Sequence, residues 1–214
     1  VSYGSQLTLS DLHIKSNNIY AASHGGIVEF DIVNEQFLKQ SNYDQLEHID
    51  ISHFYSNADN SEWFTYGSGL NGISYIGSNG QHNYFDFDFQ DANAITGNSE
   101  HVLLSYMNGL NPEIAHFVKH NNQYIFQDVY NQFPSQPESI NDMVLLGDSI
   151  YLASDAGLIK ANLYHPNLKP ENAWELLPSV AHKKLFVYGD SLIIVTDDGV
   201  YSYFEGQDAV LYAS

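Results

Sequence analysis

A repeated phrase is the feature that most limits how this chain can fold. Three segments share an apolar strand ending in Ser or Thr, a turn with Gly three residues later, and a second apolar strand. They align without a gap and read IYAASHGGIVEF, IYLASDAGLIKA and LIIVTDDGVYSY, with Ser23, Ser154 and Thr196 as the hydroxyl residues. Two weaker copies, EWFTYGSGLNGISYI and VLLSYMNGLNPEIAHF, place Thr65 and Ser105 at the end of the first strand.

The spacing of these anchors indicates the fold. They recur at intervals of 42, 40, 49 and 42 residues, so the 214 residues hold almost a whole number of repeats. A period of roughly 40–45 residues made of four strands is typical of a propeller blade. The sequence therefore predicts an all-β, single-domain β-propeller of about five four-stranded blades, at approximately 7–42, 43–90, 91–134, 135–180 and 181–214. A β-sandwich would not keep this period, and a solenoid would repeat at a shorter one. The period does not say whether five blades close a ring alone or belong to a larger ring.

The segments between the anchors agree with short strands joined by tight turns. Asp, Asn and Gly pairs, such as Asn17-Asn18 and Asp190-Ser191, supply the positive φ angles of hairpin turns. No long helix is expected, and PENAWELLP could hold one turn but fits an outer strand or a blade-to-blade loop better. The 49-residue interval predicts a protruding loop between the third and fourth blades, where function often resides.

Composition excludes several classes of protein. There are 26 acidic against 7 basic residues, a net charge of −19, and every base is Lys. We expect no nucleic-acid partner, because such binders need clustered cations. We expect no membrane insertion either, since no apolar run approaches the ~20 residues that a span requires. The absence of Cys excludes disulfides and thiolate metal sites.

The repeat resembles that of bacterial two-component-regulator propellers, which usually have Trp where this chain has Tyr20 and Tyr151. The opening, SYGSQLTLSDLHIKSNNIYAASHGGIVEFDIVNEQFLKQ, also resembles the N-terminal propeller of surface proteins linked to the type IX secretion system. In those proteins the mature chain starts just before the first blade, so with Val at position 1 we expect a processed or trimmed chain. The resemblance implies a periplasmic or extracellular, cell-surface location and a binding role. It also implies that the chain could be part of a larger protein.

Three groups of side chains are candidates for metal sites. His48, Asp50 and His53 lie in LEHIDISHFY, but a metal would need ligands from another blade, so channel lining or hydrogen bonding between blades is favoured. His116 and His120 share a face that we expect to be solvated. The acidic run FDFDFQD could bind Ca²⁺, yet it lacks the loop of a dedicated calcium site, and an acidic outer strand is favoured. We therefore predict no metal and no cofactor.

Catalytic motifs are also missing. The chain has no G-x-S-x-G and no Cys nucleophile, and the glycine-rich GSGLNG is not followed by Lys. The sequence therefore predicts a protein that is not an enzyme.

A binding site is expected at the loops that enter the innermost strand of each blade. The candidate ligand-binding residues in these loops are Tyr43, Asp44, Glu47, His48, Asp91, Asn93, Glu138, Asn141, Asp142 and His182. Tyr, Asn and Asp suit a carbohydrate or a protein segment as partner. We therefore predict a non-catalytic binding or scaffold propeller of an exported bacterial protein. A polysaccharide lyase or hydrolase with a channel-mouth site and a ligand-sensing ectodomain are the alternatives.

Overall fold

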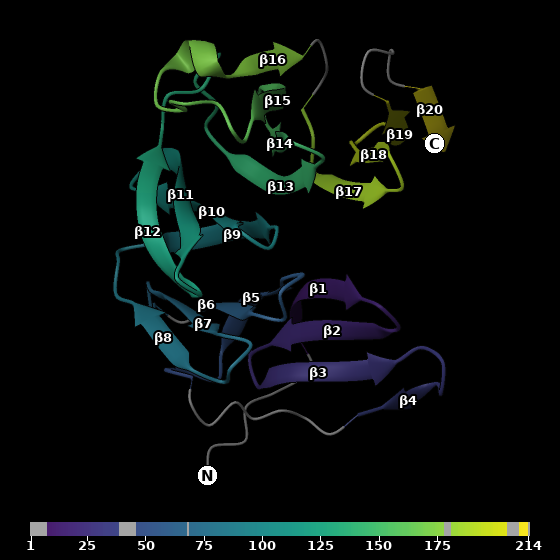
Figure 1. Ribbon diagram of the computed structural model, residues 1–214. Helices are drawn as coiled ribbons and strands as arrows, with labels where there is room; N and C mark the ends of the chain where they lie inside the picture. The colour runs from purple at the N-terminus through teal and green to yellow at the C-terminus, as the bar shows by residue number, and fades with distance from the viewer. Residues whose placement is uncertain (1–7, 39–45, 68, 178–180, 205–209, 214) are drawn as a thin grey trace. The chain divides into compact units, whose positions relative to one another are not determined.

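The structure is a computed structural model that describes residues 8–38, 46–67, 69–177, 181–204 and 210–213. Within these residues the chain forms five four-stranded antiparallel sheets, each built from strands consecutive in sequence (Figure 1). Blade one consists of β1 (Leu9–Lys15), β2 (Asn18–Ser23), β3 (Gly26–Asp31) and β4 (Gln36–Phe37). Blade two consists of β5 (Ile51–Ser56), β6 (Glu62–Tyr66), β7 (Ile73–Ile76) and β8 (His82–Phe85). Blade three is β9 (Gln90–Gly97), β10 (His101–Asn108), β11 (Asn111–His120), β12 (Gln123–Tyr130). Blade four consists of β13 (Ile140–Leu146), β14 (Ser149–Ser154), β15 (Gly157–Asn162) and β16 (Glu175–Leu177). Blade five consists of β17 (Lys184–Tyr188), β18 (Ser191–Val195), β19 (Val200–Tyr203) and β20 (Val210–Ala213). The predicted five-bladed β-propeller is confirmed.

Residue contacts divide the chain into two compact units, Val1–Ser99 and Glu100–Ser214. The first unit contains blades one and two together with β9. The second contains β10, β11 and β12 followed by blades four and five. Among the described residues, no helix is long and apolar enough to cross a membrane. Residues 170–177 form one 3₁₀ turn, Glu171–Ala173, followed by the outer strand β16, which is one of the two alternatives predicted for this segment.

The anchor residue of the repeat closes the turn that follows it. The Ser23 hydroxyl donates to the carbonyl oxygen of Gly26 at 2.8 Å, and that of Ser154 donates to Gly157 at 2.7 Å. The third copy repeats the bond at 3.2 Å. Gly26 and Gly157 have φ angles of 111° and 130°, which residues with a Cβ rarely adopt. The anchor and its glycine therefore serve backbone geometry, because both anchor serines are fully buried with their polar groups satisfied.

Blade three departs from the predicted pattern. Ser105 lies in the middle of β10 rather than at its end, because this strand continues to Asn108 before it turns at Gly109. The extra length of the blade is also used differently from our prediction of a protruding loop. It lengthens the strands, of which β11 has 10 residues and β12 has 8.

Successive blades are joined through their innermost strands. Ser10 in β1 donates its hydroxyl to the carbonyl oxygen of Ile51 in β5 at 2.7 Å, within the first unit. In the second unit, the amide of Asn141 in β13 donates to the carbonyl oxygen of His182 at 2.8 Å. Ser10 and Asn141 both occupy β-bulges, where the extra residue turns its side chain toward the next blade.

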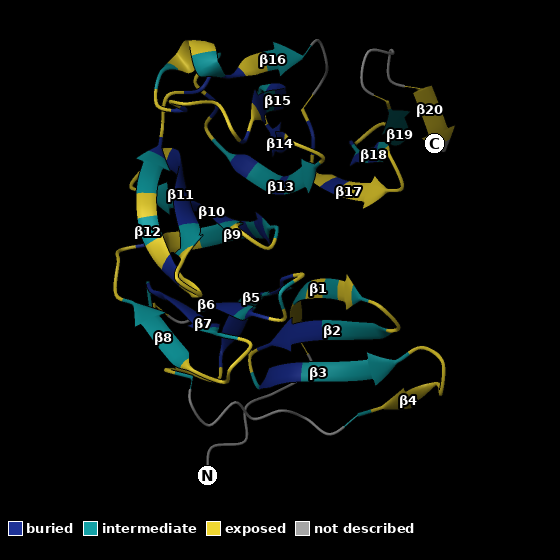
Figure 2. Ribbon diagram, in the orientation of Figure 1, coloured by how far each residue is buried: buried dark blue, intermediate teal, exposed yellow. Residues whose placement is uncertain are grey.

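The hydrophobic core lies between neighbouring blades of the same unit. Figure 2 shows the buried residues concentrated in second strands such as β6, β10 and β14. In the first unit, one cluster joins blades one and two and comprises Ala22, Ile27, Ile51, Phe54, Phe64 and Tyr66. In the second unit, a matching cluster joins blades four and five and comprises Tyr151, Ala153, Leu158, Leu185, Leu192 and Ile194. Within each unit, the buried apolar residues of the inner strands therefore lie where two neighbouring sheets pack together.

Candidate functional site

A cavity of about 460 Å³ lies in the first unit, where the loop after β6 meets the beginning of β9. Its wall combines hydroxyl, amide and carboxylate side chains with apolar and aromatic ones. The described residues that line it are Ser52, Tyr66, Gly67, Gly69, Leu70, Asn71, Phe89, Gln90, Asp91, Ala92 and Asn93. A pocket of this size and composition is suited to a small polar ligand.

One carboxylate holds the two sides of the cavity wall together. Asp88 accepts hydrogen bonds from Nδ2 of Asn71 at 2.7 Å and from Nε2 of Gln90 at 3.0 Å. The backbone N–H of Phe89 also donates to the carbonyl oxygen of Asn71 at 2.8 Å. The loop after β6 and the entry to β9 are therefore fixed to each other. Asp88 follows β8, which ends at Phe85, so our prediction that this acidic run forms an outer strand is wrong.

Two of the predicted ligand residues, Asp91 and Asn93, lie in this cavity wall. Asp91 has a φ angle of 43°, in the left-handed region that is uncommon for residues other than Gly. Within the described residues, neither side chain has a hydrogen bond or ion pair. Both polar groups are therefore available to a ligand.

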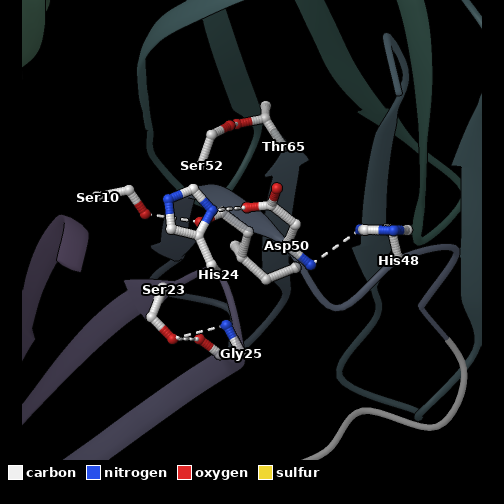
Figure 3. A network of polar contacts seen from close by, with 10 residues as sticks. Ser10, Ser23, His24, Gly25, His48, Asp50, Ser52 and Thr65 are labelled. Carbon is white, nitrogen blue, oxygen red and sulfur yellow. Dashed lines mark hydrogen bonds and ion pairs between the residues drawn. The ribbon is translucent and has the colours of Figure 1, made fainter. Parts of the chain in front are cut away.

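A network of polar contacts joins residues of blades one and two (Figure 3). His24, in the turn between β2 and β3, and Asp50, just before β5, join through Nδ1 and Oδ1 at 2.7 Å. The Asp50 side chain is 7% exposed and that of His24 is 53% exposed. Because a carboxylate can only accept, the proton of this bond lies on Nδ1 of His24. The backbone N–H of Asp50 also donates a hydrogen bond to Nδ1 of His48 at 3.0 Å.

The carboxylate of Asp50 reaches the cavity wall through Gly67. A Cβ atom added at Gly67 would lie 2.8 Å from Oδ1 and 2.9 Å from Oδ2 of Asp50, so this carboxylate occupies the space of a side chain. Ser52 lines the cavity as well and shares a 2.7 Å hydrogen bond with the hydroxyl of Thr65. The pair of His24 and Asp50 therefore borders the cavity.

Sequence analysis did not select His24, although the repeat held a clue. The other two clear copies have Asp155 and Asp197 at this position. Each of these bonds within its own blade: Asp155 accepts from the backbone N–H of Ser139 at 3.0 Å, and Asp197 pairs with Lys183. His24 instead reaches Asp50, at the start of the next blade. His24 therefore departs from the repeat in both residue type and partner, and it does not share the structural role of Asp155 and Asp197.

The remaining predicted residues of the first unit lie near the cavity or outside the described residues. Glu47 and His48 are exposed, and the backbone N–H of Glu47 donates to the hydroxyl of Tyr66, a wall residue, at 3.3 Å. Tyr43 and Asp44 fall among the residues that the structure does not describe.

In the second unit, three of the four predicted residues are engaged in joining blades. The Asp142 carboxylate accepts from the backbone N–H of Leu185 at 2.9 Å, and Asn141 donates to the carbonyl oxygen of His182. The His182 ring is 3% exposed, and burial lowers its pKa. Glu138 is exposed, and only its backbone N–H is bonded, to Asp155 at 3.3 Å. The side chains of Asn141 and Asp142 therefore have structural roles.

In the part of the chain that the structure describes, no three His, Asp or Glu residues lie close enough together to hold a metal ion. His53 bonds the Thr65 hydroxyl at 3.2 Å instead of facing Asp50 and His48.

A second buried group of polar side chains lies in the second unit. Nδ1 of His101 bonds Nε2 of His116 at 2.9 Å, and Nδ1 of His116 bonds the Tyr130 hydroxyl at 2.7 Å. His116 is 5% exposed, so our prediction that it lies on a solvated strand is wrong. Burial, with a further contribution from His101, lowers the pKa of His116 to about 4. The ring is therefore neutral in the folded protein over the physiological pH range.

This burial predicts an acid-sensitive stability. Below pH 6.5 the unfolded chain binds a proton at His116 that the folded chain does not take up until about pH 4. Stability is therefore lost as pH falls through this window, by about 2 kcal/mol between pH 7 and pH 5 for this one group. Urea unfolding at both pH values should show a smaller loss for His116→Gln than for wild type. His120→Gln, at an exposed position, should keep the full loss. Equal losses in the two variants would contradict this assignment.

Comparison with known proteins identifies the fold and no family. No protein-family model and no curated protein sequence matches the chain. Among solved structures, it is similar to the extracellular domain of BT4673 from B. thetaiotaomicron, with a TM-score of 0.63 and 12% identity over 99% of this chain and 28% of that one. It is similar to virginiamycin B lyase from Staphylococcus aureus, with a TM-score of 0.63 and 13% identity over 99% and 70%. It is also similar to PorZ, a surface component of the type IX secretion system of Porphyromonas gingivalis, with a TM-score of 0.62 and 13% identity over 98% and 28%.

At these identities the likeness concerns the fold alone. The chain spans 28% of the length of the BT4673 domain and of PorZ, so both neighbours extend well beyond the part that matches. The resemblance that the repeat indicated is thus supported by structure, while no family is shown by sequence. One neighbour is an extracellular domain, one is a surface component and one is a lyase.

Proposed function

We propose that this chain is a non-catalytic binding propeller of an exported bacterial protein and that the cavity of its first unit binds a carbohydrate. The observation that carries the proposal is the composition of the wall, where Ser52, Asn71 and Asn93 adjoin Leu70 and Phe89. Hydroxyl and amide groups can bond the hydroxyls of a sugar, and the apolar groups can pack against the faces of its ring. The volume of about 460 Å³ suits one or two sugar rings.

The neighbours support an exported location for this proposal. BT4673 contributes an extracellular domain and PorZ is a surface component, and both are larger proteins than the matched part. A periplasmic or cell-surface propeller within a larger protein is consistent with both. The excess of 26 acidic over 7 basic residues gives such a domain a strongly anionic surface.

Binding to oligosaccharides tests the proposal. We expect neutral oligosaccharides to give a measurable heat of binding by isothermal titration calorimetry. Asn93→Ala should weaken binding about tenfold, because losing a hydrogen bond of ~1.4 kcal/mol changes affinity by that factor. The matched control is Asn111→Ala, an exposed Asn on β11 in the second unit, which should bind like wild type.

Two outcomes would count against the carbohydrate site. One is that no oligosaccharide binds, and the other is that Asn93→Ala and Asn111→Ala bind equally well. The same samples test the enzyme alternative, which the His24–Asp50 pair favours because a His held by a carboxylate beside a cavity can take part in acid–base chemistry. Shortened or unsaturated products in chromatography, absent with His24→Gln, would replace the non-catalytic proposal with a catalytic one.

A further inference from the structure

We infer that the cavity of the first unit selects a ligand bearing a primary amine, such as an amino sugar, over neutral and anionic ligands. This inference rests on the carbohydrate site proposed above and names the chemical class that it prefers. It is carried by the distribution of donors, acceptors and charges in the cavity wall.

The charge in the wall is negative. Asp91 is a wall residue, and its carboxylate has no partner among the described residues. The carboxylate of Asp50 lies behind Gly67 in the same wall. None of the described lining residues is Lys, Arg or His. A cationic group would therefore meet an unpaired carboxylate without competition from a cation of the protein.

The amides of the wall present acceptors. Asn71 and Gln90 each direct their NH₂ group to Asp88, at 2.7 and 3.0 Å. Because the oxygen of a primary amide lies on the other side of its carbon from the bonded NH₂ group, both oxygens turn away from Asp88. An ammonium group carries three donors and no acceptor, so it is complementary to a wall of carboxylate and amide oxygens. A ligand carboxylate or sulfate would find few donors here and a repelling charge.

The backbone conformation at Asp91 indicates that the surrounding structure holds this residue in a defined position. Asp91 has a φ angle of 43°, in the left-handed region, and it follows Gln90, whose side chain is hydrogen-bonded to Asp88. Conformations of this kind occur often at ligand sites, where the surrounding structure maintains them. The net charge of −19 acts in the same direction, since the field of the protein attracts cations toward the site.

The test compares three ligands that share a sugar backbone but differ in charge. These are oligomers of glucosamine, of N-acetylglucosamine, and of a uronic acid, titrated by calorimetry at low and at physiological salt. We expect the glucosamine oligomer to bind at least tenfold more tightly than the N-acetylated oligomer, and the uronic acid to bind most weakly. Asp91→Asn should abolish the preference for the glucosamine oligomer, because Asn has the same shape and also tolerates a positive φ angle but carries no charge. The matched control is Asp190→Asn, at an exposed position in the second unit, which should keep the preference.

Each outcome has a defined meaning. If the neutral oligomer binds as tightly as the amine and Asp91→Asn changes nothing, the inference fails and the carbohydrate site stands. If Asp190→Asn removes the preference as Asp91→Asn does, general charge rather than Asp91 is responsible and the inference fails. If the uronic acid binds most tightly, the inference is also overturned. If none of the three binds, both the inference and the proposed function fail.

Discussion

Replacing Leu152 by Ala will lower the free energy of unfolding by about 2–5 kcal/mol, the range for a fully buried Leu. Leu152 is 0% exposed in the centre of β14, opposite Met143 on one side and Ile159 on the other. The substitution removes apolar contact and leaves a cavity that closely packed neighbouring strands cannot fill. Urea unfolding followed by tryptophan fluorescence or circular dichroism measures the change.

The matched control for this core position is Leu110→Ala. Leu110 is 90% exposed, in the turn between β10 and β11 of the same unit. We expect its replacement to change stability by no more than about 0.5 kcal/mol. If both substitutions cost the same, the second strand of blade four would not occupy the interior position that the fold requires.

Replacing Glu113 by Ala will destabilise the second unit by about 1–3 kcal/mol, because it removes the acceptor of the buried Tyr106 hydroxyl. Glu113 is 7% exposed and accepts from the Tyr106 hydroxyl at 2.5 Å. It also accepts from the side-chain amides of Asn108 and Asn131, each at 3.2 Å. Burial, with a further contribution from Glu113, raises the pKa of Tyr106, so this hydroxyl remains a donor at neutral pH.

Thermal and urea unfolding of Glu113→Ala should be compared with those of Glu138→Ala. Glu138 is exposed in the same unit, and its hydrogen bond to Asp155 is made by its backbone N–H, which the substitution keeps. Its replacement should leave stability within about 0.5 kcal/mol of wild type. A Glu113→Ala variant as stable as Glu138→Ala would mean that the Tyr106 hydroxyl finds another acceptor, and that the carboxylate is not needed for the fold.

The repeat predicted blades one, four and five well because their information is local. In each, the anchor hydroxyl and the glycine three residues later belong to one hairpin and bond each other, as in Ser154 and Gly157. The hairpin therefore forms from residues adjacent in sequence. Blade three was predicted less accurately, since its turn comes three residues later than Ser105 indicates and the anchor bond is absent.

The candidate site was predicted in part. Asp91 and Asn93 were selected from the expected position of the loop entering a blade, and both line the cavity. Asn141 and Asp142 were selected by the same argument, and their side chains join two blades instead. The residue types are the same in both cases, so composition could not distinguish a ligand-facing position from one occupied by the next blade.

The sequence by itself determined the five-bladed fold, because a propeller blade is specified by turn residues and strand patterns within about 40 residues of chain. Only the tertiary structure decided which polar groups remain for a ligand. That depends on contacts between distant residues, such as His24 with Asp50 and Asn71 with Asp88, which are set by how neighbouring blades and loops pack. The repeated phrase therefore establishes the architecture, whereas the cavity arises where its copies differ and where separate segments meet.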